Sequence, residues 1–265
     1  MIYGYSERGI FNSIIYYLDY KRPDLIGEFL NKILELEKDV FSSTSHSFIF
    51  LNEQSFSDFG DSDLTIIAKP RSSKGKKAVV FIEGKVKTFD GKYNLEKECE
   101  NVIKTIKGES DFEGSNIFIQ LYYKYLLQTV VNSKEDIKLE EKDTSTAGLK
   151  INSIFKRKYK NPERRIGDNG IVHKACEMIK GAGENYFYVA ILPVDVKSEN
   201  LKEKYDAFNK ALSNESENMN TENVRCVYWG EIEDFFEDAE SVIGNFNYNK
   251  CKDKKDEYNS QIYNK

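Results

Sequence analysis

The sequence predicts an α/β protein in which helices flank a mixed β-sheet on both faces. Segments with helical periodicity alternate with short apolar runs of the kind found in buried strands. Between two of these runs lies only a short polar stretch, residues 69–76, which predicts an antiparallel hairpin. The later strands are separated by helices, which predicts parallel pairing.

The composition sets limits on the class of protein. The chain has 265 residues, of which 40% are apolar and 31% charged, so it can bury a core. It has no apolar run long enough for a membrane span, and we expect no signal peptide at its N-terminus. Its four cysteines form no CxxC pair and its histidines number two, which disfavours a disulfide scaffold or a multi-histidine metal site and favours a cytoplasmic location.

The first half of the chain should contain two helices followed by three strands. Ser6 suits an N-cap, and the helix after it carries an apolar stripe through Phe11, Ile14 and Leu18. Pro23 suits the first turn of a second helix. The three strands are expected at residues 48–51, 63–68 and 78–85.

The second half should alternate helices and strands after a polar interruption. One domain is expected over residues 1–250, with a polar excursion at about 132–168 and a charged tail at 251–265. Gly181 and Gly183 should end one of the helices. The expected helices are 95–106, 115–131, 169–180 and 199–212 and one acidic helix after the last strand; the expected strands are 186–192 and 224–229.

Charge is distributed unevenly along the chain. The formal net charge is −5, which does not suggest a protein that coats nucleic acid through bulk charge. Residues 69–87 nevertheless hold seven basic side chains against one acid, and residues 150–165 hold the same balance. We therefore expect any nucleic-acid contact to be confined to a groove lined by these two stretches.

Two acidic residues and a lysine on neighbouring strands form the strongest chemical pattern. Glu83 and Lys85 follow an apolar strand and share one face, because side chains alternate along a strand. Asp63 opens the preceding strand, so the hairpin can bring it close to Glu83. Two hard oxygen ligands with room for water suit Mg²⁺. Asp61, one strand period earlier, is the rival ligand, and Asp63 is preferred because it adjoins the apolar run directly.

Asp63, the hairpin and the run Phe81-Ile82-Glu83-Gly84-Lys85 together resemble the signature of the PD-(D/E)XK nuclease superfamily. Ser62 stands where the signature has proline. The resemblance implies a restriction-endonuclease-like α-β-β-β-α-β core with C-terminal additions. It also implies that Asp63, Glu83 and the carbonyl of Gly84 hold Mg²⁺, with Mn²⁺ as a substitute, while Lys85 orients the attacking water.

The function implied by the resemblance is that of a metal-dependent endodeoxyribonuclease acting in restriction, phage defence or repair. DNA would be the partner, and a homodimer would suit the cutting of both strands. Two alternatives stay open. The chain could be a non-catalytic nucleic-acid-binding or regulatory protein on the same fold, or an unrelated α/β protein in which Glu83 and Lys85 are only an ion pair.

Further candidates come from the helices and the basic stretches. Glu7 lies on the inward stripe of the first helix, either near the metal, as in archaeal Holliday-junction resolvases, or as a helix-end charge. Its neighbour Arg8 is expected to pair with a surface acid. Gln120, Lys124 and Gln128 form a polar stripe, either a solvated face or a border of the cleft similar to the Gln motif of RecB-like nucleases, in which Lys124 stands where the motif has tyrosine. The remaining candidates for contact with DNA are Lys87, Lys156, Arg157 and Lys158, the last three alternatively part of a solvated loop.

Overall fold

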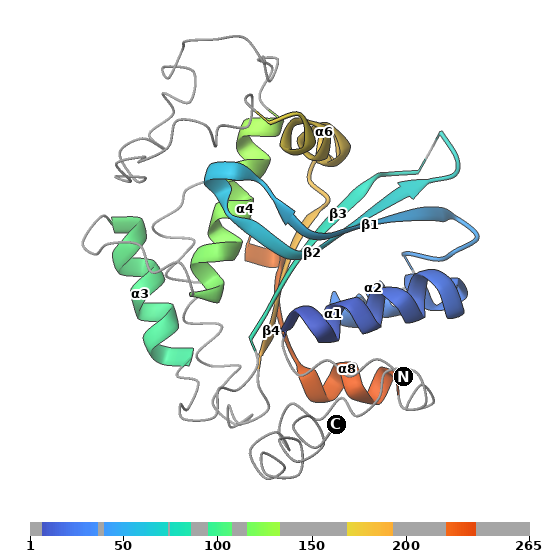
Figure 1. Ribbon diagram of the computed structural model, residues 1–265, viewed down its shortest axis with the longest axis horizontal. Coiled ribbons are helices and arrows are strands. Elements are labelled where there is room, and N and C mark those ends of the chain that lie inside the picture. The colour runs from blue at the N-terminus through green and yellow to red at the C-terminus, as the bar shows by residue number, and fades with distance from the viewer. Residues whose placement is uncertain are drawn as a thin grey trace, which may run out of the picture.

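The computed structural model contains one five-stranded sheet whose spatial order is the order of the strands in the chain (Figure 1). It describes residues 7–36, 40–73, 75–85, 95–107, 116–132, 169–192 and 221–236. The strands are β1 (His46–Ser55), β2 (Asp61–Pro70), β3 (Ala78–Gly84), β4 (Tyr186–Leu192) and β5 (Val224–Tyr228).

The pairing of the strands makes the sheet mixed. β1 pairs antiparallel with β2, and β2 pairs antiparallel with β3. β3 pairs parallel with β4, and β4 pairs parallel with β5. The α/β class, the hairpin and the parallel strands after the helices are thereby confirmed. β1 and β2 are both longer than the apolar runs that predicted them.

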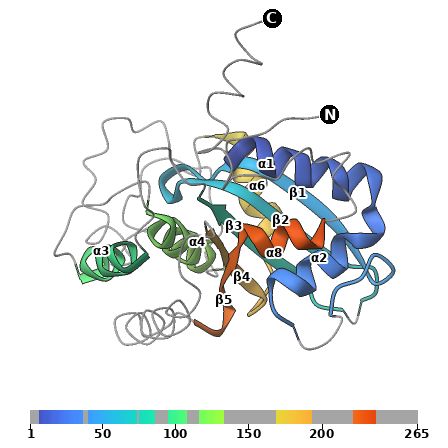
Figure 2. The ribbon, with the colours of Figure 1, turned by 90° about the horizontal axis from the view of Figure 1, so that it is seen from below.

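Helices cover both faces of the sheet (Figures 1 and 2). One face carries α1 (Glu7–Ile15), α2 (Ile26–Ile33) and α8 (Trp229–Phe235). The other carries α4 (Ile117–Val131) and α6 (Gly170–Ile179), while α3 (Leu95–Lys107) packs against α4. The first helix differs from its prediction, because α1 ends at Ile15 and a π-helical turn, Tyr16–Lys21, carries Leu18.

Side-chain caps determine where two of the helices begin. Asn116 is the N-cap of α4, and its side-chain oxygen accepts hydrogen bonds from the backbone N–H groups of Phe118 and Ile119. Asn169 caps α6 in the same way. Beyond the C-terminus of α6, Gly181 has a φ of 83°. The predicted glycine stop of this helix is confirmed, since a positive φ favours glycine.

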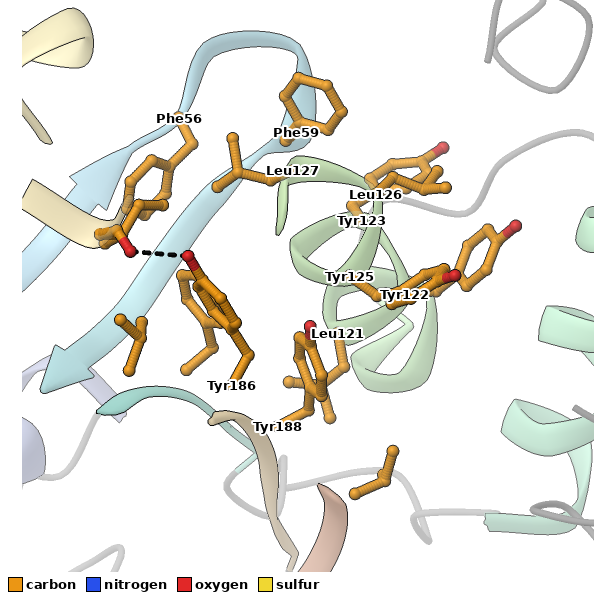
Figure 3. Packing of buried hydrophobic residues seen from close by; sticks show 14 of the residues in the cluster. Phe56, Phe59, Leu121, Tyr122, Tyr123, Tyr125, Leu126, Leu127, Tyr186 and Tyr188 are labelled. Atoms are coloured by element: carbon orange, nitrogen blue, oxygen red, sulfur yellow. Dashed lines mark hydrogen bonds between the residues drawn. The ribbon is translucent and has the colours of Figure 1, made fainter. Parts of the chain in front are cut away.

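The two faces of the sheet bury cores of different character. Ile66, Val80, Ile82 and Val189 pack with α1, α2 and α8. The core on the opposite face is rich in tyrosine, from α4 and from β4, whose Tyr186 and Tyr188 lie beside α4 (Figure 3). Tyr188 stacks on Phe81 of β3 with ring centroids 5.9 Å apart. The side chains of Glu83 and Lys124, discussed below, lie on this tyrosine-rich face.

Several expectations fall outside the residues that the structure describes. These are the polar excursion beyond residue 132, the helix expected at 199–212 and the tail at 251–265. In the described part of the chain, no helix has the length and apolar character needed to cross a membrane.

Candidate active site

Asp63 and Glu83 meet where β2 begins and β3 ends. The last paired residues of the antiparallel ladder at this end are Leu64 and Ile82, so Asp63 and Glu83 are the next residue on each strand. The backbone N–H of Gly84 donates a hydrogen bond of 2.8 Å to Oδ2 of Asp63. This bond joins the two strands through the carboxylate itself. The prediction that both acids lie on adjacent antiparallel strands is confirmed.

Glu83 is completely buried at the end of an apolar strand. Neither of its carboxylate oxygens has a hydrogen-bond partner among the described residues. Burial raises the pKa of Glu83 to about 8, and the Asp63 carboxylate adds to this effect, whereas the ammonium groups of Lys124 and Lys85 oppose it. Because neither oxygen has a hydrogen-bond partner among the described residues, the carboxyl group can accept a donor or, once deprotonated, coordinate a cation.

Lys124 reaches this carboxylate from α4. Its Nζ lies 3.6 Å from Oε1 of Glu83, and both side chains have no solvent-exposed surface. The same Nζ donates hydrogen bonds of 2.9 Å to the backbone carbonyls of Phe59 and Asp61. Burial lowers the pKa of Lys124, while the carboxylates of Glu83 and Asp61 act in the opposite direction.

The position of Lys124 corrects the expectation that it contacts nucleic acid from a polar stripe. α4 is buried on nearly every side, so the ammonium faces the sheet rather than solvent. Gln120, one turn earlier, is partly buried, and its Oε1 is buried with no hydrogen-bond partner among the described residues. The role of Gln120 toward nucleic acid stays a prediction.

Lys85 follows the last residue of β3 and is held by its backbone on both sides. Its N–H donates to the carbonyl of Ile191 on β4 at 2.9 Å. Its carbonyl accepts a hydrogen bond of 2.8 Å from the indole Nε1 of Trp229, the first residue of α8. The Lys85 side chain thus leaves a fixed backbone, close enough to Glu83 to lower the pKa of that carboxyl.

Gly84 allows the opposite face of the sheet to close against this strand. A Cβ placed on Gly84 would lie 2.9 Å from the ring of Phe11 and 3.0 Å from the ring of Trp229. Such approaches are shorter than real Cβ contacts, so a side chain would push β3 or the rings away. The glycine in the Glu-Gly-Lys run therefore has a packing reason, and its carbonyl as a metal ligand stays a prediction.

Asp61 and Asp63, the two rival metal ligands, lie in different surroundings. The Asp61 side chain is exposed, and its backbone carbonyl is bound by Lys124. Asp63 is half-buried, with its carboxylate directed to the end of β3. This geometry favours Asp63 as the partner of Glu83.

Of the remaining candidate residues, Arg8 has a partner other than Glu83, and the side chains of the others lie outside the described residues. Arg8 forms an ion pair of 2.5 Å with Glu53, which confirms its pairing with a surface acid. Glu7 begins α1, but its side chain lies outside the described residues, so its place in the site stays a prediction. The same holds for the basic residues Lys87, Lys156, Arg157 and Lys158.

The basic stretch at residues 69–77 is not part of the site. Lys69 stands six residues from Asp63 along β2, which at about 3.4 Å per residue is roughly 20 Å. Lys77 donates to the carbonyls of Met178 and Lys180 at the end of α6, at 2.6 and 2.5 Å. Arg71 donates to the carbonyls of Ser43 and His46. The expected contribution of residues 69–77 to a groove is therefore wrong, because the hairpin turn lies at the opposite end of the strands from Lys85, and the contribution expected of Lys87 and residues 150–165 lies outside the described residues.

The oxygen ligands at this site suit a hard cation that takes two ligands from the protein and the rest from water or substrate. Asp63 and Glu83 provide two carboxylates, and no cluster of three or more His, Cys, Asp or Glu side chains suited to a metal occurs in the described part of the chain. Mg²⁺ usually keeps several waters and binds through one or two carboxylates together with substrate phosphates. The buried oxygens of Glu83, without hydrogen bonds from the described residues, suit such a ligand.

Comparison with known proteins adds no relative: no family model matches the chain, nor does any curated protein or solved structure. The functional argument therefore rests on the geometry of the site. Sequence reasoning missed the contacts of Lys124 with Glu83 and of Trp229 with Lys85. A lysine within the otherwise apolar helix α4 was the available signal for the first contact.

Proposed function

We propose that this chain is a Mg²⁺-dependent nuclease that hydrolyses phosphodiester bonds in DNA at a site formed by Asp63, Glu83 and Lys85. The observation that carries the proposal is the carboxylate of Glu83, fully buried and with no hydrogen bond to either oxygen from the described residues. Lys124 balances the charge of this carboxylate from 3.6 Å but leaves both oxygens without a hydrogen bond, and a buried polar atom without one is costly. Asp63 alongside makes a divalent cation the partner that best suits both acids.

The connectivity supports the finer fold assignment, which is part of this proposal. With α2, α3 and α6 as further helices, the order α1, β1, β2, β3, α4 and β4 agrees with the α-β-β-β-α-β core of restriction-endonuclease-like nucleases. β5 and α8 would be additions that extend the sheet and cover one face. In that core, the acids and the lysine of the PD-(D/E)XK signature come from the same two central strands as Asp63, Glu83 and Lys85 here.

A bound Mg²⁺ would polarise the scissile phosphate and lower the pKa of a coordinated water from about 15.7 toward neutrality. Asp63 and Glu83 would hold the ion through oxygens from two strands that the Gly84 N–H links directly. Because both strands belong to the central sheet, the carboxylates keep their separation without rearrangement. Such preorganisation is what electrostatic catalysis requires.

Lys85 would act on the attacking water and on the phosphate oxygens. Its backbone is fixed to β4 and to Trp229, and its partly buried side chain begins at the end of the strand. An ammonium in this place would orient the water and stabilise the negative charge that grows on the phosphate. A nucleophilic side chain would not be needed.

DNA is the proposed substrate, and a homodimer would place two sites on a duplex. The basic stretch at residues 150–165 remains a candidate for the phosphate contacts, since the hairpin cluster at 69–77 lies far from the site. Restriction, phage defence and repair all suit such an enzyme.

A cleavage assay tests the proposal. Plasmid, linear duplex, single-stranded DNA and RNA would be incubated with Mg²⁺, Mn²⁺ or EDTA, using wild type, Asp63→Asn and Glu83→Gln. Asp24→Asn is the matched control, because this exposed aspartate pairs with Arg22 away from the site. We expect metal-dependent cleavage of DNA by wild type and the control only. DNA binding without any cleavage would support the regulatory alternative. The absence of both DNA binding and cleavage would refute the proposal.

A further inference from the structure

Lys124 is a buried cation that contacts two separate segments of the chain, the turn at residues 59–61 and the end of β3. Its side chain comes from the middle of α4 and has no exposed surface. Its Nζ bonds to the carbonyls of Phe59 and Asp61 and lies 3.6 Å from Glu83. A lysine is rarely fully buried without a specific partner. The position therefore calls for an explanation beyond packing.

The geometry fixes the ammonium independently of Glu83. Two of its three N–H groups are taken by carbonyls that flank Gly60, whose φ of 76° shapes the turn leading into β2. The distance from Nζ of Lys124 to Oε1 of Glu83 is longer than a hydrogen bond. The ammonium therefore balances the charge of the carboxylate without donating a hydrogen bond to either oxygen. A charge held in this way leaves Glu83 available for a ligand.

We propose that Lys124 is a positioning residue that sets the arrangement of the two metal-binding carboxylates, an inference that rests on the nuclease function proposed above. Its hydrogen bonds anchor the start of β2, two residues before Asp63. Its charge holds Glu83 at the end of β3. One atom on α4 thereby ties together the strands that carry both ligands. Groups that orient metal ligands in this way commonly contribute about 10- to 100-fold to metal affinity or activity.

Removing Lys124 should change metal affinity in opposite directions for the two roles it could have, a positioning residue or only a nearby positive charge. If Lys124 were only a nearby positive charge, its removal would relieve repulsion and tighten the binding of a divalent cation. If it positions the ligands, its removal frees the start of β2 and leaves Glu83 without a fixed partner. Metal binding then weakens although a positive charge has been lost.

The test measures Mn²⁺ binding to the full chain by electron paramagnetic resonance, which does not depend on activity. Lys124→Met keeps the length of the side chain and removes its charge and donors. Lys124→Gln is shorter and uncharged, so it restores neither the charge beside Glu83 nor the pair of carbonyl contacts, and it decides the question if the methionine variant does not fold. Tyr186→Phe is the matched control, because it removes buried hydrogen bonds to Ile179 and Asn132 from the same core without touching the site.

We expect both Lys124 variants to bind Mn²⁺ at least about tenfold more weakly than wild type, and Tyr186→Phe to bind it as wild type does. Cleavage by the Lys124 variants should recover in part as Mg²⁺ is raised. Unchanged or tighter Mn²⁺ binding by these variants, or equal weakening by Tyr186→Phe, would overturn the positioning role alone. Failure of wild type to bind Mn²⁺ would overturn the proposed function and the inference with it.

Discussion

The seven residues of β3 alternate between the two faces of the sheet, and the two faces differ in chemical character. Val79, Phe81 and Glu83 face the tyrosine-rich core under α4, whereas Val80 and Ile82 face the core under α1, α2 and α8. Strand alternation alone separates the two sets. At the end of the strand, one face carries a buried ion pair, and the other packs aromatic rings against Gly84.

The difference shows how a buried charge is accommodated in this fold. Burying Glu83 and Lys124 costs free energy, and an ion pair in the interior rarely returns all of it. The opposite face offsets that cost with apolar packing of Phe11, Ile82 and Trp229, which lie fully out of solvent. Changes on the first face should therefore alter chemistry, and changes on the second should alter stability and only indirectly the site.

The largest effect on cleavage is expected for substitutions of the proposed site residues Lys85 and Asp63. Lys85→Ala should lower single-turnover cleavage by at least about a hundredfold, because it removes charge that acts on the transition state. Asp63→Asn should do the same through loss of metal affinity. DNA binding, measured by fluorescence anisotropy, should change by no more than a few-fold for either variant.

The control for this prediction is Asp61→Asn. Its side chain is exposed, and its contact with Lys124 is made by the backbone, which the substitution keeps. We expect it to retain most of the cleavage activity. Full cleavage by Lys85→Ala would contradict the assigned mechanism, and loss of cleavage in Asp61→Asn alone would exchange the roles of the two aspartates.

The sequence predicted the strands well and the contacts between them only in part. The strand at 186–192 has the predicted bounds, because its apolar run begins just after the turn at residues 181–184. The pairing of Asp63 with Glu83 followed from the hairpin alone. Lys124 could not be placed in this way, since its spacing with Gln120 shows a stripe but not what lies opposite it. The contact of Trp229 with Lys85 likewise depends on how α8 docks after β5.

The next effect is expected from the packing face at Gly84. Gly84→Ala should lower the free energy of unfolding by about 1–3 kcal/mol, since the methyl group meets Phe11 and Trp229. It should also weaken Mn²⁺ binding, because the Gly84 N–H holds Asp63. Urea unfolding and Mn²⁺ titration measure the two effects.

A second substitution sharpens that prediction. Phe11→Leu gives room to the new methyl group, so the double variant should be more stable than the sum of the two single changes implies. Additive losses would mean that the clash does not explain the effect of Gly84→Ala.

A smaller effect on chemistry is expected for Trp229→Phe. The change removes the hydrogen bond to the Lys85 carbonyl and leaves space beside Phe11. Stability should fall by about 1–3 kcal/mol and cleavage by several-fold. Mn²⁺ affinity should stay as in wild type, because neither carboxylate is touched. A loss of Mn²⁺ binding equal to that of Gly84→Ala would show that the two faces are not separable at this point.

The smallest effect is expected at the far end of the packing face, where His46 begins β1. Burial lowers the pKa of His46 below its usual 6.5, and a backbone hydrogen bond at Lys76 opposes the shift. Its ring contacts Ser45, Phe41 and Phe48, while Arg71 binds its carbonyl.

The unfolded chain therefore takes up a proton at His46 more readily than the folded one. The stability that neutral His46 contributes is present above pH 6.5 and is lost as the pH falls through the lower pKa of the folded state. Between about pH 8 and about pH 5.5, wild type should lose more thermal stability than His46→Gln, by no more than about 3 °C. The measurement is the melting temperature of each of the two proteins at each of the two pH values, in EDTA. Equal losses would show that His46 does not titrate with folding, while DNA cleavage at neutral pH should be the same in both proteins.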